Sequence, residues 1–151
     1  MIAFAARYGC DLVLKLGFGR EGDVFASDRP SAVKFFHDQQ AFDREVEVYQ
    51  VLAELNIETI AGHAVPKLVR HDSEYLAIEM SIVTPPFLPD FAGAMLEYEV
   101  SDFEEHVQEE HHARLMDLYG DRWQDVLAVA DAFTRATGYV LMDIKPGNIT
   151  F

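Results

Sequence analysis

The chain has 151 residues, which fits one domain and is long enough to bury a hydrophobic core. Apolar residues make up 50% and charged residues 25%, a balance that excludes a disordered chain. The 26 acidic and 12 basic side chains give a formal net charge of -14, which repels phosphate backbones and disfavours nucleic acid as a partner.

The sequence also bears on the cellular compartment. A single cysteine, Cys10, excludes an internal disulfide framework. No apolar run reaches the roughly 18 residues of a membrane span, so we expect no membrane partner. The N-terminal stretch is interrupted by Arg7 and Asp11 and has no small-residue cleavage site, so we expect no signal peptide. These features predict a cytoplasmic protein.

The first third of the chain has the composition of β-strands. Residues 12–19, 23–27 and 31–36 are rich in Val, Leu and Phe and are separated by glycines or a turn, which predicts an antiparallel meander. Apolar residues then recur at three- and four-residue steps over residues 39–55, which predicts a helix with one wide apolar face.

A second strand pair is predicted further along the chain. Residues 67–71 and 75–83 flank Asp72-Ser73-Glu74, a sequence typical of a hairpin turn. The segment 84–89 contains three prolines, which remove three backbone donors and exclude an interior strand. We therefore expect a linker there, between a β-rich half and a helical half.

Two helices are predicted in the second half. Ser101 and Glu104 have capping-box spacing, which predicts a helix over about 102–118. Asp121 with Gln124 repeats that spacing before a second helix over 122–137. Gly138 is a typical residue to end the second helix.

A glycine-rich segment is the first candidate functional motif. Residues 17–24 fit the pattern G-x-G-x-x-G-x-V, and glycines let backbone N–H groups approach phosphate oxygens. In dinucleotide-binding folds the last glycine opens a helix, whereas strand-forming residues follow it here. The pattern therefore favours a glycine loop that joins two antiparallel strands over a nucleotide. A Walker A loop is excluded because the chain has no G-K-[ST].

Lys34 is the second candidate, because it interrupts the apolar run 31–36. An unpaired buried ammonium costs several kcal/mol, so an acidic partner is expected, and the next helix offers Glu45 or Glu47. The alternative is an exposed strand lysine beside a solvated helix face.

A polar cluster near the C-terminus is the third candidate. Asp143, Lys145 and Asn148 supply a carboxylate that could accept a proton, a cation for a phosphate and an amide oxygen for Mg²⁺. The alternative is a polar turn centred on Pro146-Gly147. A short strand is predicted over 149–151.

In their order, these motifs resemble the eukaryotic-like protein kinase superfamily. The resemblance covers residues 12–151 and rests on the segments GFGREGDV, AVKFF, FDREVEVYQVL, YLAIEM and YVLMDIKPGNITF. It implies an α+β, protein kinase-like fold truncated after the catalytic loop. An N-lobe (1–83) would have a five-stranded antiparallel sheet and one helix, and a reduced helical C-lobe (84–151) would end in the catalytic-loop motif.

The resemblance also implies roles for individual residues. The nucleotide would be bound by Gly17, Gly19, Gly22, Val24, Lys34, Glu45, Glu79 and Ser81. Within that set, Glu45 would orient Lys34, and Glu79 to Ser81 would form a hinge that contacts adenine through backbone groups, with Ile78 as gatekeeper. The catalytic residues would be Asp143 as base, Lys145 and Lys34. Asn148 would be a metal ligand.

The chain departs from the family pattern in three respects. The spacing from Gly22 to Lys34 and on to Glu45 is compact, so Glu47 remains an alternative to Glu45. Leu141 and Met142 stand where the family has His and Arg, so regulation by a phosphorylated activation loop is not expected. The D-F-G segment, which supplies the main Mg²⁺ carboxylate, does not follow Asn148, so Mg²⁺ binding is expected to be weak or absent.

The resemblance implies an ATP-binding module that nominally transfers the γ-phosphoryl group to a Ser or Thr hydroxyl of a protein. Because D-F-G is absent, the alternative is an inactive pseudokinase that acts as a protein-interaction module. An unrelated α+β domain with coincidental motifs is disfavoured by the motif order. We also expect self-association or a protein partner, because the apolar face of the helix 122–137 lacks the later helices that would cover it.

Overall fold

The structure is a computed structural model that describes residues 1–91, 93–100, 105–142 and 144–151, without the side chains of 105–109, 111 and 112. The helices are α1 (Ile2–Tyr8), α2 (Gln39–Glu54), α3 (Glu97–Val100), α4 (Glu105–Tyr119) and α5 (Trp123–Thr137). The strands are β1 (Leu12–Phe18), β2 (Gly22–Ser27), β3 (Ser31–Phe36), β4 (Thr59–Ile60), β5 (His63–Ala64), β6 (Leu68–Asp72), β7 (Ala77–Ser81), β8 (Ala94–Leu96) and β9 (Tyr139–Leu141).

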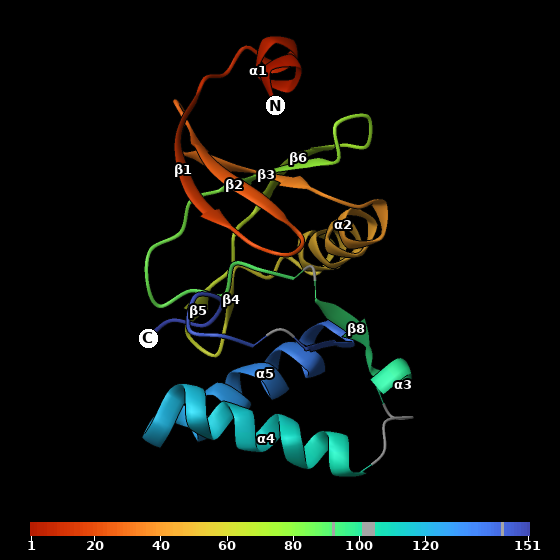
Figure 1. The fold of residues 1–151 in the computed structure, drawn as a ribbon, viewed down its shortest axis with the longest axis vertical. Helices are drawn as coiled ribbons and strands as arrows, with labels where there is room; N and C mark the ends of the chain where they lie inside the picture. The colour runs from red at the N-terminus through yellow and green to blue at the C-terminus, as the bar shows by residue number, and fades with distance from the viewer. Residues whose placement is uncertain (92, 101–104, 143) are drawn as a thin grey trace.

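A five-stranded antiparallel sheet carries the first half of the chain. Its strand order is β1-β2-β3-β7-β6, so β3 and β7 occupy interior positions. Helix α1 lies above this sheet and α2 lies beside its other face, while α4 and α5 lie on the far side of α2 (Figure 1). The α+β class, the five-stranded sheet and the reduced helical half are confirmed.

Strand β3 is buried on both faces, and its alternation separates two cores. Val33 and Phe35 face α1, where the Phe4 ring meets Phe35 edge-on at 5.4 Å between ring centroids. Ala32 and Phe36 belong to the larger core that also contains α2. The sequence interpretation assigned no helix to the first residues, so α1 is an addition to the predicted fold.

Helix α2 forms where the apolar period predicted it. The Asp38 side chain accepts a hydrogen bond from the backbone N–H of Ala41 at 2.9 Å, which caps the first turn. Tyr49 on α2 meets Phe91 at 5.3 Å between ring centroids, and Phe91 stacks on Phe133 of α5 at 5.4 Å. These contacts join α2 and α5 within the larger core, and the division at residue 83 stays a prediction.

The start of α5 differs from the expected capping box. A 3₁₀ turn, Gly120–Arg122, precedes the helix, and its N-cap is Arg122 without a side-chain hydrogen bond, so the Asp121 cap is wrong. The end is confirmed, because Gly138 has φ 77°, the left-handed conformation that glycine adopts most easily. The predicted cap at Ser101 and Glu104 lies outside the described residues.

The C-terminal residues 149–151 do not form the predicted strand. The strand next to the polar cluster is β9, which pairs with β8 ahead of the cluster. Thr150 is held instead by the segment after β7: its backbone N–H donates to the Phe87 carbonyl at 3.2 Å, and its hydroxyl accepts from the Phe87 N–H at 3.0 Å. These two bonds bring the end of the chain beside Phe87 without a strand ladder.

The apolar face of α5 is covered, contrary to the expectation that it would be exposed. Val126, Val129 and Phe133 are all buried, with exposed fractions of 0%, 3% and 0%, and α4 packs against this helix. The predicted reason for self-association is therefore wrong. Within the described ranges, every helix falls short of the length and apolar character needed to cross a membrane.

Candidate functional site

A cleft of about 550 Å³ lies between two parts of the chain. One is the glycine hairpin, formed by β1, β2 and the turn between them, and the other is the polar segment 145–148 near the C-terminus. Its lining combines Gly17, Gly19, Gly22 and Val24 from the hairpin, Ala32 and Lys34 from β3, Met80 and Ser81 from β7, Ile82, Val83 and Asp90 from the segment after β7, and Lys145 and Asn148 near the C-terminus. The cleft thus brings together residues from all three candidate motifs.

Lys34 is buried at the cleft and paired with two carboxylates. Its side chain is 6% exposed, and its Nζ lies 2.7 Å from Oε2 of Glu45 and 2.8 Å from Oδ1 of Asp90. Glu47 lies elsewhere, with its Oε2 3.5 Å from the hydroxyl of Tyr139. The structure therefore pairs Lys34 with Glu45 and excludes the exposed-lysine alternative.

Burial and charge act together on this cluster. Burial alone would lower the pKa of Lys34, but the carboxylates of Glu45 and Asp90 outweigh it and raise that pKa above its ordinary value. Burial raises the pKa of Glu45 to about 7; the attraction of Lys34 opposes this rise, while Asp90 and Glu21 add to it. Both shifts favour the protonated forms, as expected where two carboxylates share one ammonium.

Asp90 is the site residue that the sequence interpretation missed. It follows the proline-rich segment, which was assigned only as a linker. Its partner is 56 positions away in the chain, so no local spacing links the two residues. Leu88 and Phe91 on either side are both fully buried, and these anchors hold the Asp90 carboxylate at the cleft.

The three glycines of the hairpin serve different purposes. A Cβ on Gly22 would lie 2.2 Å from the carbonyl oxygen of Phe35, so this glycine is needed for close contact between β2 and β3. Gly17 and Gly19 have open space around the Cβ position. The tip of the hairpin is tied to the end of β3, because the His37 N–H donates to the Glu21 carbonyl at 2.9 Å.

The expected hinge does not present Glu79 to the cleft. Glu79 pairs with β3 and β6 on its two sides, and the Ser81 N–H donates to the Lys67 carbonyl at 2.9 Å. These backbone groups are committed to the sheet, so the adenine hinge at Glu79–Ser81 is not supported. Met80, Ile82 and Val83 line the cleft instead, while Ile78, the expected gatekeeper, is buried in the core.

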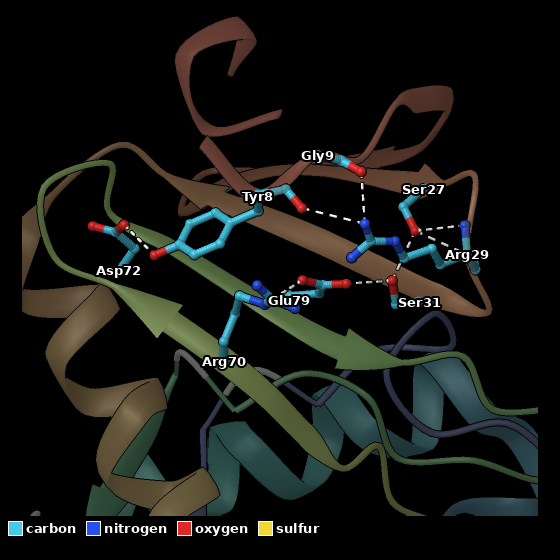
Figure 2. A network of polar contacts seen from close by, with 8 residues as sticks. All are labelled: Tyr8, Gly9, Ser27, Arg29, Ser31, Arg70, Asp72 and Glu79. Atoms are coloured by element: carbon cyan, nitrogen blue, oxygen red, sulfur yellow. Dashed lines mark hydrogen bonds and ion pairs between the residues drawn. The ribbon is translucent and has the colours of Figure 1, made fainter. Parts of the chain in front are cut away.

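The Glu79 side chain points to the opposite face, into a polar network under α1 (Figure 2). Its Oε1 accepts from the Ser31 hydroxyl at 2.6 Å, and its Oε2 lies 2.8 Å from Nε of Arg70. Tyr8 of α1 donates its hydroxyl to Asp72 at 2.6 Å, and Arg70 stacks over the Tyr8 ring. The network attaches α1 to the sheet.

Asp143, the expected base, lies outside the described residues. Of the residues that follow it, Ile144 and Ile149 are buried, and the Asn148 N–H donates to the Lys145 carbonyl at 2.8 Å. Lys145 and Asn148 both line the cleft. Lys145 also lines a second hollow of about 360 Å³, which it shares with Arg20, Glu21, Gly93 and Met142.

Among the residues that the structure describes, no group of three His, Cys, Asp or Glu side chains is arranged to hold a metal ion. Asn148 is 7% exposed and lines the cleft. Its chemistry fits one ligand of Mg²⁺, which prefers oxygen donors.

No protein-family model matches the chain, and a search of the curated proteins finds no relative. Two solved structures of APH(2″)-IIa are similar in fold. The complex with streptomycin and ATP matches at 10% identity over 79% of this chain, with a TM-score of 0.45. The gentamicin complex matches at 14% identity over 78%, with a TM-score of 0.44.

The chain spans 38% of the length of each of these two structures. The protein kinase-like arrangement is visible in the chain itself, as a glycine hairpin and a lysine on β3 that pairs with a glutamate on the helix packed behind the sheet.

Proposed function

We propose that this chain is the ATP-binding part of a kinase-like phosphotransferase. The observation that carries the proposal is the Lys34–Glu45 pair, buried at a cleft of about 550 Å³ that also contains the glycine hairpin. A buried ammonium beside an open cavity can hold phosphate oxygens. The cavity volume suits a nucleotide-sized ligand.

The lining of the cleft is divided by chemistry. Its apolar part is formed by Val24, Ala32, Met80, Ile82 and Val83, which suit the faces of an adenine ring. Its polar part is formed by Lys34, Asp90, Lys145 and Asn148. In our proposal the adenine ring lies against the apolar part, and the phosphates lie between Lys34 and the glycine hairpin.

The polar part would handle the charge of the phosphates. Lys34, held by Glu45, would bind oxygens of the α- and β-phosphates, and Lys145 would lie nearer the transferred group. Mg²⁺, with Asn148 as one ligand, would supply neutralisation of charge on the phosphates. Asp143 keeps its proposed role as the base that accepts the proton of the acceptor hydroxyl.

The acceptor is proposed to be a Ser or Thr hydroxyl of a protein. The second hollow shares Glu21 and Lys145 with the cleft and would receive the acceptor beside the terminal phosphate. If the chain binds ATP but transfers no phosphate to a mixture of Ser/Thr peptides, the result would favour the pseudokinase alternative. In that alternative the chain acts by binding a protein partner.

Nucleotide binding is tested by calorimetric titration of ATP into the purified chain with Mg²⁺ present. Lys34→Met should weaken binding by about tenfold or more, since it removes a charge-assisted contact to phosphate. Lys15→Met is the matched control: Lys15 pairs with Asp23 on the hairpin and does not line the cleft, so its affinity should be that of the unaltered chain.

A second variant separates binding from folding, because Lys34→Met leaves two carboxylates without their cation. Gly19→Glu places a carboxylate at the cleft where the Cβ meets no atom within 4 Å, so the fold should be kept. Its thermal melting should match that of the unaltered chain, while ATP binding weakens by about tenfold or more. If ATP binds both cleft variants as well as the unaltered chain, the proposal is wrong.

A further inference from the structure

Asp90 shares the ammonium that the proposed function assigns to phosphate. Its Oδ1 lies 2.8 Å from Nζ of Lys34, and its side chain is 22% exposed at the cleft, whereas Glu45 on the same ammonium is fully buried. Asp90 is therefore the carboxylate on the accessible side of Lys34. A phosphate entering the cleft has to replace it or lie beside it.

The position of Asp90 is fixed by its neighbours. Leu88 and Phe91 are both 0% exposed; the Leu88 N–H donates to the Ala64 carbonyl at 2.9 Å, and Phe91 stacks on Phe133. With a buried anchor on each side, the backbone at Asp90 has little room to withdraw. Its carboxylate therefore stays near any ligand of Lys34.

The charge balance at the cleft disfavours a bare nucleotide. Lys34 carries one positive charge, and the carboxyl groups of both Glu45 and Asp90 already lie within 2.8 Å of its Nζ. Glu21 also lines the cleft and acts electrostatically on Glu45. A triphosphate brought against this cluster meets like charge, and a divalent cation between carboxylate and phosphate would relieve the repulsion.

We propose that Asp90 couples nucleotide binding to a divalent cation: without the cation it competes with phosphate for Lys34, and with the cation it serves as a ligand shared with the phosphates. The proposal rests on the proposed nucleotide site. It adds a carboxylate from the segment after β7 to the amide oxygen of Asn148, and carboxylate oxygens are ligands that Mg²⁺ prefers.

The test compares ATP affinity in EDTA and in Mg²⁺ for the unaltered chain and for Asp90→Asn. In the unaltered chain, ATP should bind about tenfold or more tightly with Mg²⁺ than without. Asp90→Asn should bind ATP more tightly in EDTA and lose most of the gain from Mg²⁺, so the ratio of the two affinities approaches one. Asp131→Asn is the control, because Asp131 is exposed on α5 and lines neither hollow. This substitution changes the net charge of the chain by the same amount as Asp90→Asn.

A direct measurement of the cation completes the test. Mn²⁺ bound in the presence of a non-hydrolysable ATP analogue, followed by electron paramagnetic resonance, should fall in Asp90→Asn and persist in Asp131→Asn. An unchanged affinity ratio in Asp90→Asn, or equal ATP binding by the unaltered chain with and without Mg²⁺, overturns this inference and leaves the nucleotide site standing. Absence of ATP binding in the unaltered chain and in Asp90→Asn, under both conditions, overturns both proposals.

Discussion

The two faces of the five-stranded sheet each bury an ion pair, but in different surroundings. On one face, Lys34 of β3 pairs with Glu45 beside a cleft of about 550 Å³. On the other face, Glu79 of β7 pairs with Arg70 and Ser31 beneath α1, and neither Glu79 nor Arg70 lines that cleft. Strand register separates the two pairs, because Lys34 is opposite Ile78 while Glu79 is opposite Val33.

A buried charge is therefore not sufficient to identify a binding site. The network around Glu79 attaches a helix to the sheet, and protein groups surround its carboxylate. The cluster around Lys34 adjoins space large enough for a ligand. The comparison teaches that the cavity beside the charge, rather than the charge itself, distinguishes the candidate functional face.

The prediction with the largest expected effect tests whether residues on the α1 face contribute to stability but not to nucleotide binding. Phe4→Ala removes a fully buried ring and should lower the free energy of unfolding by about 3–5 kcal/mol, measured by urea denaturation. ATP affinity of the folded variant should not change. Ile2→Ala, at a side chain that is 88% exposed, is the control and should unfold like the unaltered chain. Loss of ATP affinity in folded Phe4→Ala would show that the two faces are coupled.

A smaller effect is expected at the ion pair under α1. Glu79→Gln leaves Arg70 without its counter-charge and should lower the free energy of unfolding by about 2–3 kcal/mol, less than for a fully buried pair because the Arg70 side chain is 33% exposed. ATP affinity should stay the same. Glu58→Gln, in an exposed pair with Lys67, should leave the urea midpoint unchanged. A nucleotide-binding defect specific to Glu79→Gln would contradict the assignment of the faces.

The smallest effect concerns pH on the cleft face. Since burial raises the pKa of Glu45 to about 7, the folded state holds a proton that the unfolded chain releases near pH 4.5. The contribution of Glu45 to stability is thus full below pH 4.5 and is lost as pH rises towards 7. Glu45→Gln keeps the neutral form at every pH, so its stability relative to the unaltered chain should increase by about 1–3 kcal/mol from pH 5 to pH 8.

Urea denaturation at pH 5, 6, 7 and 8 measures that difference. Glu47→Gln is a control on the same helix, because Glu47 does not contact Lys34 and should show no such trend. A pH-independent difference between Glu45→Gln and the unaltered chain would mean that Glu45 is ionised throughout this range.

Local patterns in the sequence predicted the parts of the fold that local physics determines. The strands β1 to β3 and helix α2 follow from composition and period. The helical period also predicts Glu45 rather than Glu47 as the partner of Lys34. Glu45 lies three residues after Phe42 and four before Tyr49, on the buried face of α2.

The missed features depend on contacts distant in sequence. Helix α1 has seven residues and no side-chain cap, so it is stabilised by packing of Phe4 on β3 rather than by a local signal. Strands β8 and β9 have three residues each and are defined only by pairing between residues about 45 positions apart. Asp90 becomes a site residue only when the segment after β7 folds against Lys34.

Gly22 has a consequence for the comparison of related sequences. Because any side chain there would collide with the Phe35 carbonyl, selection for a folded hairpin alone would retain this glycine even after loss of ligand binding. Gly17 and Gly19 carry no such steric demand. Some related sequences with this hairpin could keep Gly22 but carry bulky residues in place of Gly17 and Gly19. Such a pattern would indicate that ligand binding has been lost while the hairpin fold is maintained.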